Sequence, residues 1–96
     1  MTYQVLQTRR FGRQYKKLQD NVTADVDDAI SVIAEDPESG EQKKGDLAEL
    51  RVYKFHSQRQ LYLLGYIVDD EVRLVHLEAV GPHENFYRDL KKSWNV

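Results

Sequence analysis

The side chains best suited to chemistry lie in one string near the end of the chain, GPHENFYRDL at residues 81–90. Gly-Pro favours a turn, and a helix that begins near His83 places His83 and Tyr87 at i and i+4, on one side of its first turn. An imidazole and a phenol held together could act as acid and base, and Arg88 could neutralise phosphate charge. The same spacing also suits an ordinary helix start, with His83 near the cap and Tyr87 lying on a sheet.

Other kinds of reactive site are excluded or lack their signature. The chain has no cysteine, which excludes disulfides, thiolate zinc sites, iron–sulfur clusters and a cysteine nucleophile. It contains no P-loop, no dinucleotide-binding glycine motif and no serine in a nucleophile elbow. Its three histidines are too scattered for a recognisable metal site. Any catalysis is therefore expected to use His, carboxylates, Tyr, Lys or Arg, with no metal and no cofactor.

Length and composition indicate one globular domain over residues 1–96. A chain of 96 residues is close to the usual size of a single domain, and its 41% apolar content can build one core. No apolar run approaches the roughly 20 residues that a membrane span needs. The first residues, MTYQVLQTRR, lack the hydrophobic centre of a signal peptide. We therefore expect a cytoplasmic protein without a membrane partner.

Charge is distributed unevenly along the chain. The net charge of −2 argues against indiscriminate binding to nucleic acid, which normally requires a basic domain. Residues 20–49, however, hold ten acidic residues against only Lys43 and Lys44. The other 66 residues carry twelve Lys and Arg against six Asp and Glu. The chain can thus present a locally positive face, although two solvated helix faces of opposite sign would give the same count.

Hydrophobic periodicity predicts an α+β domain in the order β-α-α-β-β-β-α. A helical hairpin should cover one face of a small antiparallel sheet, with the first strand added at an edge and the other face less covered. The side chains expected to pack the hairpin on the sheet are Phe11, Tyr15, Leu18, Val26, Ile30 and Ile33. The expected strands are 3–7, 50–55, 60–68 and 72–80, the expected helices are 9–19, 22–36 and one from about 83, and 38–46 is expected to be a loop.

Several segments, taken in order, resemble the RelE/ParE superfamily of toxins from type II toxin–antitoxin systems. They are KGDL at 44–47, LRVYKF at 50–55, YLLGY at 62–66 and the closing GPHENFYRDL, with DDAI at 27–30 in the preceding helix. The resemblance implies a RelE-like fold and a partner antitoxin that binds and silences the toxin. Ribonuclease members of this superfamily cut mRNA in the ribosomal A site without a metal, and other members poison DNA gyrase.

The same resemblance implies site residues. Arg51 matches a basic residue on the first strand of the meander, His83 matches a His or Arg after the last strand, and Tyr87 matches an aromatic acid/base or stacking residue. Tyr53 stands where ribonuclease members often have a second basic residue, and Lys54 is one position further, on the opposite strand face. Leu63 stands where they usually have an arginine that holds the scissile phosphate, so Arg59 in the preceding turn could reach in its place.

A metal-independent ribonuclease needs a base for the 2′-hydroxyl, cations for the phosphorane and an acid for the 5′-oxygen. We expect His83 or Glu78 as the base, and Tyr87 or His83 as the acid. Arg51, with Arg59 or Arg88, should hold the phosphate, so Arg51, His83 and Tyr87 should surround it together. Glu78 shares a strand face with His76, and the pair could equally be two polar residues facing solvent.

The sequence thus predicts a ribosome-dependent mRNA endonuclease whose partners are an antitoxin, the ribosome and mRNA. The catalytic residues would be His83, Tyr87 and Arg51, and the substrate-binding residues would be Arg59, Lys54, Tyr53, Glu78 and Arg88. The alternatives are a non-catalytic inhibitor of DNA gyrase and an inactive homologue that only binds antitoxin. The hydroxyl of Tyr87 and the imidazole of His83 favour cleavage, whereas Leu63 opposes it.

Overall fold

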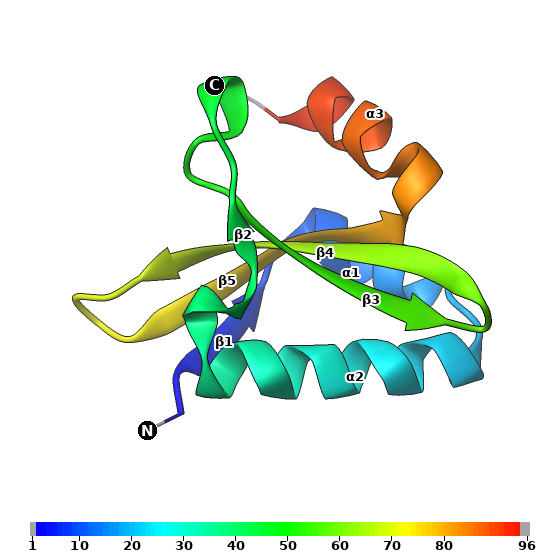
Figure 1. The fold of residues 1–96 in the computed structure, drawn as a ribbon, viewed down its shortest axis with the longest axis horizontal. Coiled ribbons are helices and arrows are strands. Elements are labelled where there is room, and N and C mark those ends of the chain that lie inside the picture. The colour runs from blue at the N-terminus through cyan, green and yellow to red at the C-terminus, as the bar shows by residue number, and fades with distance from the viewer. Residues whose placement is uncertain (1, 95–96) are drawn as a thin grey trace.

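The computed structural model describes residues 2–94, in which three α-helices and a five-stranded sheet form one body (Figure 1). The order of strands across the sheet is β1-β5-β4-β3-β2. In chain order the elements are β1 (Gln4–Gln7), α1 (Arg9–Lys16), α2 (Asp20–Glu35), the 3₁₀ turn η1 (Pro37–Ser39), β2 (Glu41–Gln42), the 3₁₀ turn η2 (Gly45–Leu47), β3 (Arg51–Ser57), β4 (Gln60–Asp69), β5 (Leu74–Pro82) and α3 (His83–Ser93).

The expected antiparallel meander is confirmed in β3, β4 and β5. Its first turn is tight: Ser57 pairs with Gln60, and Gln58 and Arg59 between them have φ values of 53° and 65°. Two successive residues with positive φ give a turn whose twist matches that of the flanking strands. This turn fixes the register of β3 on β4, and with it the face on which each side chain of β3 lies.

The sheet differs from the expected one at both edges. β1 pairs with β5 in parallel, so the prediction of a purely antiparallel sheet is wrong. No tight turn joins these two strands, and a long crossover through the rest of the chain permits parallel pairing. At the other edge, Glu41 and Gln42 form the short strand β2 against β3, inside the segment expected to be a loop.

The helices α1 and α2 cover one face of the sheet, as expected. α1 packs on β5 and α2 packs on β3. Phe11, Val26 and Ile33 are buried against strand residues such as Tyr66, whereas Tyr15, Leu18 and Ile30 are only partly buried at the margin. Ser, Thr and Asn are the residue types that favour a helix N-cap, so the sequence predicts Thr8 as the cap of α1 and Asn21 or Thr23 as the cap of α2. Thr8 is confirmed, because its hydroxyl accepts a hydrogen bond from the amide of Phe11 at 3.1 Å. The N-cap of α2 is instead Gln19.

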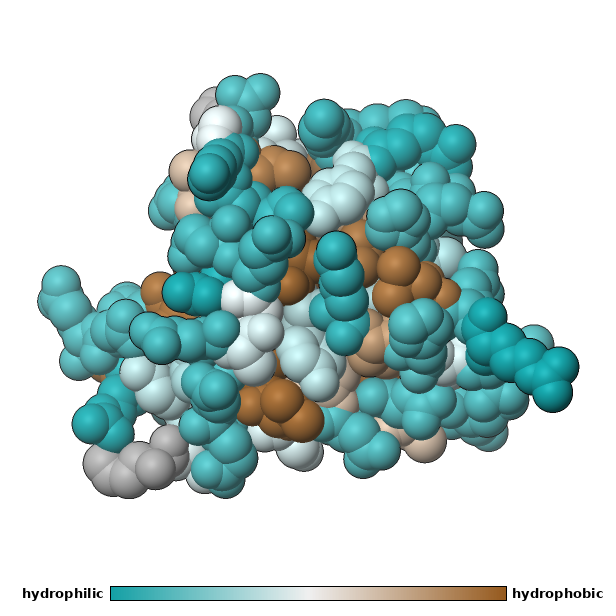
Figure 2. Space-filling view, in the orientation of Figure 1, coloured by the Kyte–Doolittle hydropathy of each residue, from teal (hydrophilic) through white to brown (hydrophobic). Residues whose placement is uncertain are grey.

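The helix α3 covers part of the opposite face, so that this face is less open than expected (Figure 1). Phe86 and Leu90 from α3 enter a second core, which also contains Leu47, Leu50, Val52, Leu63 and Ala79. Gly65 allows this close packing, because a Cβ there would lie 3.0 Å from Cζ of Phe86. Figure 2 shows apolar side chains between α3 and the strands, bordered by polar ones.

A β-bulge changes the alternation of β5. Gly65 pairs with Ala79 and Tyr66 pairs with Leu77, so Glu78 is the extra residue. Val75 and Leu77 therefore face α1 and α2, whereas Ala79 faces α3. Regular alternation along the sequence predicts these three side chains on one face of the strand, which is wrong for Ala79.

Candidate active site

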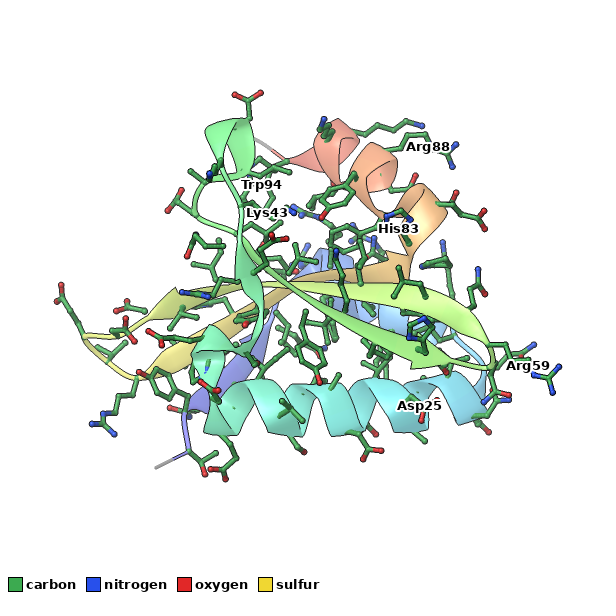
Figure 3. The ribbon with its side chains drawn as sticks, viewed as in Figure 1. Asp25, Lys43, Arg59, His83, Arg88 and Trp94 are labelled. Atoms are coloured by element: carbon green, nitrogen blue, oxygen red, sulfur yellow. The ribbon has the colours of Figure 1, made fainter. Side chains whose placement is uncertain are left out.

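Tyr87 and His83 both lie on α3, and the helix begins at His83 as expected. With both residues in one regular helix, the i, i+4 spacing places them on one side of its first turns. Tyr87 is half-buried, and its ring meets the ring of Phe86 edge-on at 5.1 Å between centroids. Because Phe86 is anchored in the second core, this contact orients the phenol of Tyr87. His83 is exposed on the α3 side of the sheet (Figure 3).

A lysine ammonium stands against the Tyr87 ring. Nζ of Lys43 lies 5.4 Å from the ring centroid and 3.2 Å from Oε1 of Glu41. The backbone of Lys43 is fixed to the sheet, because its amide donates a hydrogen bond to the carbonyl of Leu50 at 2.9 Å. The pKa of Lys43 is raised, mainly by the neighbouring Tyr87 side chain and further by Glu41, with burial acting in the opposite direction. The side chain therefore stays a cation near neutral pH.

Lys54 supplies a second cation on the same face of the sheet. It pairs with Leu63 across β3 and β4, and Leu63 belongs to the core under α3. The hydrogen bond and charge of Lys43 lower the pKa of Glu41, and the charge of Lys54 adds to this effect. Glu41 pairs with Val52, which also faces α3. We call Glu41, Lys43, Lys54, His83 and Tyr87 the α3-face cluster.

Arg51 lies on the other side of the sheet. Its strand neighbours Tyr53 and Phe55, two and four residues further, pack on the core under α1 and α2. Nη1 of Arg51 donates hydrogen bonds to the carbonyls of Gly40 at 2.6 Å and Glu38 at 3.4 Å. The expectation that Arg51 surrounds one phosphate together with His83 and Tyr87 is therefore wrong, because the sheet separates them. Tyr53 is on the same side as Arg51 and is also outside the α3-face cluster.

The other expected phosphate ligands are dispersed. Arg59 is exposed at the tip of the β3–β4 hairpin and points away from the body of the protein (Figure 3). Arg88 is exposed on α3, where it hydrogen-bonds Asn85 at 3.0 Å and forms an ion pair with Asp89 at 3.6 Å. Leu63 is fully buried in the core beneath α3, and β4 carries no Lys or Arg.

Glu78 is placed at the β5 bulge and is half-buried. Burial raises its pKa, and the charges of Arg10 and His76 oppose that rise. Arg10 in turn lies 5.6 Å from the ring centroid of Trp94 and donates a hydrogen bond to the carbonyl of Ser93 at 3.4 Å. Glu78 thus belongs to a group at the C-terminal end of α3, whereas the cation that contacts Tyr87 is Lys43.

Comparison with known proteins assigns the chain to a protein family. Residues 5–91 match the family described as the ParE-like toxin of type II bacterial toxin–antitoxin systems. The chain belongs to this family. The RelE/ParE resemblance seen in the sequence is therefore confirmed. No match was found among curated protein sequences.

Solved structures of RelE toxins resemble this toxin over most of its length. The toxin–antitoxin complex RelBE2 from Mycobacterium tuberculosis is 25% identical, with a TM-score of 0.77 over 86% of this chain and 100% of that chain. The intact Escherichia coli RelBE complex is 24% identical, with a TM-score of 0.69 over 82% and 94%. The isolated E. coli RelE toxin is 22% identical, with a TM-score of 0.67 over 97% and 99%. The two E. coli structures support the fold.

In the sequence, Lys43 and Lys44 are two loop cations that would contact backbone phosphates or nothing at all, and no pattern singles out Glu41. Glu41 belongs to a strand of two residues, which is too short to produce a recognisable alternation. The toxin has no group of three or more His, Asp or Glu within residues 2–94 that could hold a metal ion. In the same range, no helix is long and apolar enough to cross a bilayer.

Proposed function

We propose that this toxin cleaves mRNA on the ribosome and that the α3-face cluster is its cleaving centre. The observation that carries the proposal is the position of Tyr87. Its ring lies against an ammonium group, on the sheet face to which Lys54 also belongs, with His83 one turn earlier on the same helix. A proton-transferring phenol and imidazole beside cations are the groups that RNA cleavage without a metal requires.

The proposed reaction is an internal transesterification of the RNA backbone. The 2′-oxygen attacks phosphorus, the bond from phosphorus to the 5′-oxygen breaks, and the products carry a 2′,3′-cyclic phosphate and a 5′-hydroxyl. His83 takes the proton from the 2′-hydroxyl, since an imidazole exchanges protons near neutral pH. Tyr87 donates a proton to the leaving 5′-oxygen, and nearby ammonium groups stabilise the phosphorane.

We further propose a cognate antitoxin as the toxin's partner, because two of the similar structures are toxin–antitoxin complexes. A groove of about 390 Å³ between α1 and the start of α3 offers a docking surface. Its walls combine cations, including Arg13 and Lys17, with apolar groups such as Leu18 and Phe86. A segment with acidic and apolar side chains would complement it. The ribosome, mRNA and antitoxin would all be met in the cytoplasm.

Primer extension on mRNA from cells expressing the toxin tests the proposed cleavage. We expect discrete breaks within translated codons. These breaks should disappear when translation initiation is blocked. Co-expression of the protein encoded beside the toxin should suppress these breaks if that protein is the antitoxin. Intact transcripts in growth-arrested cells would overturn the proposal.

Inhibition of DNA gyrase is the second candidate function, and the buried Leu63 favours it because β4 contributes no cation to the α3 face. Growth arrest with DNA-damage signalling and intact transcripts would identify a gyrase inhibitor. A chain that binds antitoxin, yet leaves growth, transcripts and DNA intact, would be an inactive homologue.

A further inference from the structure

We propose that Lys43 binds the scissile phosphate of the RNA, so that the loop after β2 contributes the phosphate-binding cation that the central strand β4 lacks. This inference rests on the proposed function. β4 presents Leu61 and Leu63 to the α3 face, and both pack on the second core. The cation that lies over the ring of Tyr87 comes instead from the segment after β2.

The position of Lys43 is fixed on both sides along the chain. Before it, Glu41 and Gln42 pair with Val52 and Arg51 of β3. The loop after Lys43, which contains η2, is closed by a hydrogen bond that the side-chain amide of Gln42 donates to the carbonyl of Ala48. Together with the hydrogen bond from Lys43 to Leu50, these contacts hold the ammonium in place before substrate arrives. Preorganised charge of this kind needs little rearrangement in the transition state.

The ammonium group of Lys43 is partly buried, which strengthens its attraction for a phosphate, yet it remains accessible to one from solvent. Its side chain is 25% exposed, and one side of the ammonium lies over the Tyr87 ring. Partial burial strengthens the attraction between a cation and phosphate, because less water screens it. A phosphate bound by this ammonium would stand beside the phenol that must protonate its leaving oxygen. One contact would therefore both bind the substrate and align it with the acid.

Glu41 is the ion-pair partner of Lys43 in the free toxin. Its carboxylate is 3.2 Å from Nζ, and its side chain is 65% exposed. An exposed ion pair contributes little stability, so a phosphodiester, which gains a second negative charge as the phosphorane forms, can displace the carboxylate. Lys54 acts on the same carboxylate and can accept it when Lys43 turns to the phosphate. The Glu41–Lys43 pair thus keeps the ammonium oriented without blocking it permanently.

The matched control for Lys43 is its neighbour Lys44, which is exposed and has the same charge. Lys43→Met keeps the packing on the Tyr87 ring and removes the charge, Lys43→Arg keeps the charge, and Lys44→Met removes an equal charge one residue away. Each full-length variant is added to ribosomes programmed with mRNA, and single-turnover cleavage is measured together with Tm. Because Met preserves the apolar stem contacts, Tm should stay near that of the wild type.

Loss of one preorganised charge should slow Lys43→Met cleavage by roughly 10²–10³-fold. Lys43→Arg should recover most of that loss, and Lys44→Met should stay within about threefold of the wild type, as expected for a solvated charge. Equal rates for Lys43→Met and Lys44→Met, with an active wild type, would overturn the role of Lys43. A wild type that does not cleave would instead overturn the proposed function.

Discussion

The hydroxyl of Tyr66 accepts a hydrogen bond from the amide of Gly40 at 2.8 Å and donates one to the carbonyl of Pro37 at 2.7 Å. Tyr66 is fully buried, and a Cβ at position 40 would lie 2.5 Å from its hydroxyl oxygen. Arg51 binds the Gly40 carbonyl from the same side of the sheet. These hydrogen bonds at Pro37 and Gly40 lie on the α2 face of the sheet, and they hold the segment that places Glu41 and Lys43 on the α3 face.

Replacing Tyr66 by Phe should lower the free energy of unfolding by about 1–3 kcal/mol, because the amide of Gly40 and the carbonyl of Pro37 lose a buried partner. Urea unfolding measures this change. Tyr53→Phe is the matched control, since within residues 2–94 the Tyr53 hydroxyl has no described hydrogen bond. Equal stability of the two variants would show that the Tyr66 hydroxyl does not hold the loop.

Ile33 and Ile30 test how α2 packs on the sheet. Ile33 is fully buried, whereas Ile30 is only partly buried at the edge of the same core. Ile33→Ala should cost about 2–5 kcal/mol of unfolding free energy, and Ile30→Ala should cost clearly less, since a partly exposed site leaves a smaller cavity. Thermal or urea unfolding compares them. A larger loss at Ile30 would contradict the orientation of α2.

Glu78 should make stability depend on pH. Burial raises its pKa above the ordinary value of 4.5, so the folded chain holds this proton more tightly than the unfolded chain. The contribution of Glu78 to stability therefore falls as pH rises from the ordinary value through the raised one, and is constant above it. Glu78→Gln removes the ionised form, so it should raise Tm relative to the wild type more at about pH 7.5 than at about pH 4.

The control for this experiment is Glu71→Gln, at an exposed position in the β4–β5 turn. Its Tm should track that of the wild type across the same pH range. A Glu78→Gln curve that stays parallel to the wild-type curve would show that burial does not disfavour the Glu78 carboxylate.

The sequence predicts the turns and helix starts that depend on residues close together along the chain. The turn at residues 58–59 sets the meander, Thr8 begins α1, and Gly-Pro precedes the helix that places His83 and Tyr87 one turn apart. The bulge at Glu78 was not predictable, because one extra residue in a strand leaves the composition unchanged and reverses the alternation that follows. The direction of β1 depends on long-range pairing and not on its own residues.

The candidate site was predictable only where it lies within one element. Alternation placed Arg51 and Lys54 on opposite faces of β3, but nothing in the strand indicates which face α3 will cover. That choice depends on Phe86 and Leu90 meeting Val52 and Leu63, which are distant in sequence. The sequence could not separate Lys43 from Lys44 for a similar reason, since the contact of Lys43 with Tyr87 joins residues 44 positions apart.

We expect Tyr87 and His83 to transfer protons during cleavage of mRNA. Tyr87→Phe keeps the ring that packs on Phe86 and Lys43 and removes only the hydroxyl, while His83→Ala removes an exposed imidazole. Each change should therefore leave Tm close to the wild-type value and slow cleavage by roughly 10²–10⁴-fold, the usual contribution of a general acid or base.

The most direct measurement is the single-turnover rate at which purified Tyr87→Phe toxin cuts ribosome-bound mRNA, compared with the wild type and with Tyr53→Phe. Tyr53 lies on the opposite face of the sheet, so its variant controls for the loss of a tyrosine hydroxyl. We predict a loss of at least about 10²-fold for Tyr87→Phe alone. Wild-type cleavage rates for both variants would contradict proton transfer by Tyr87 and exclude a cleaving centre on the α3 face.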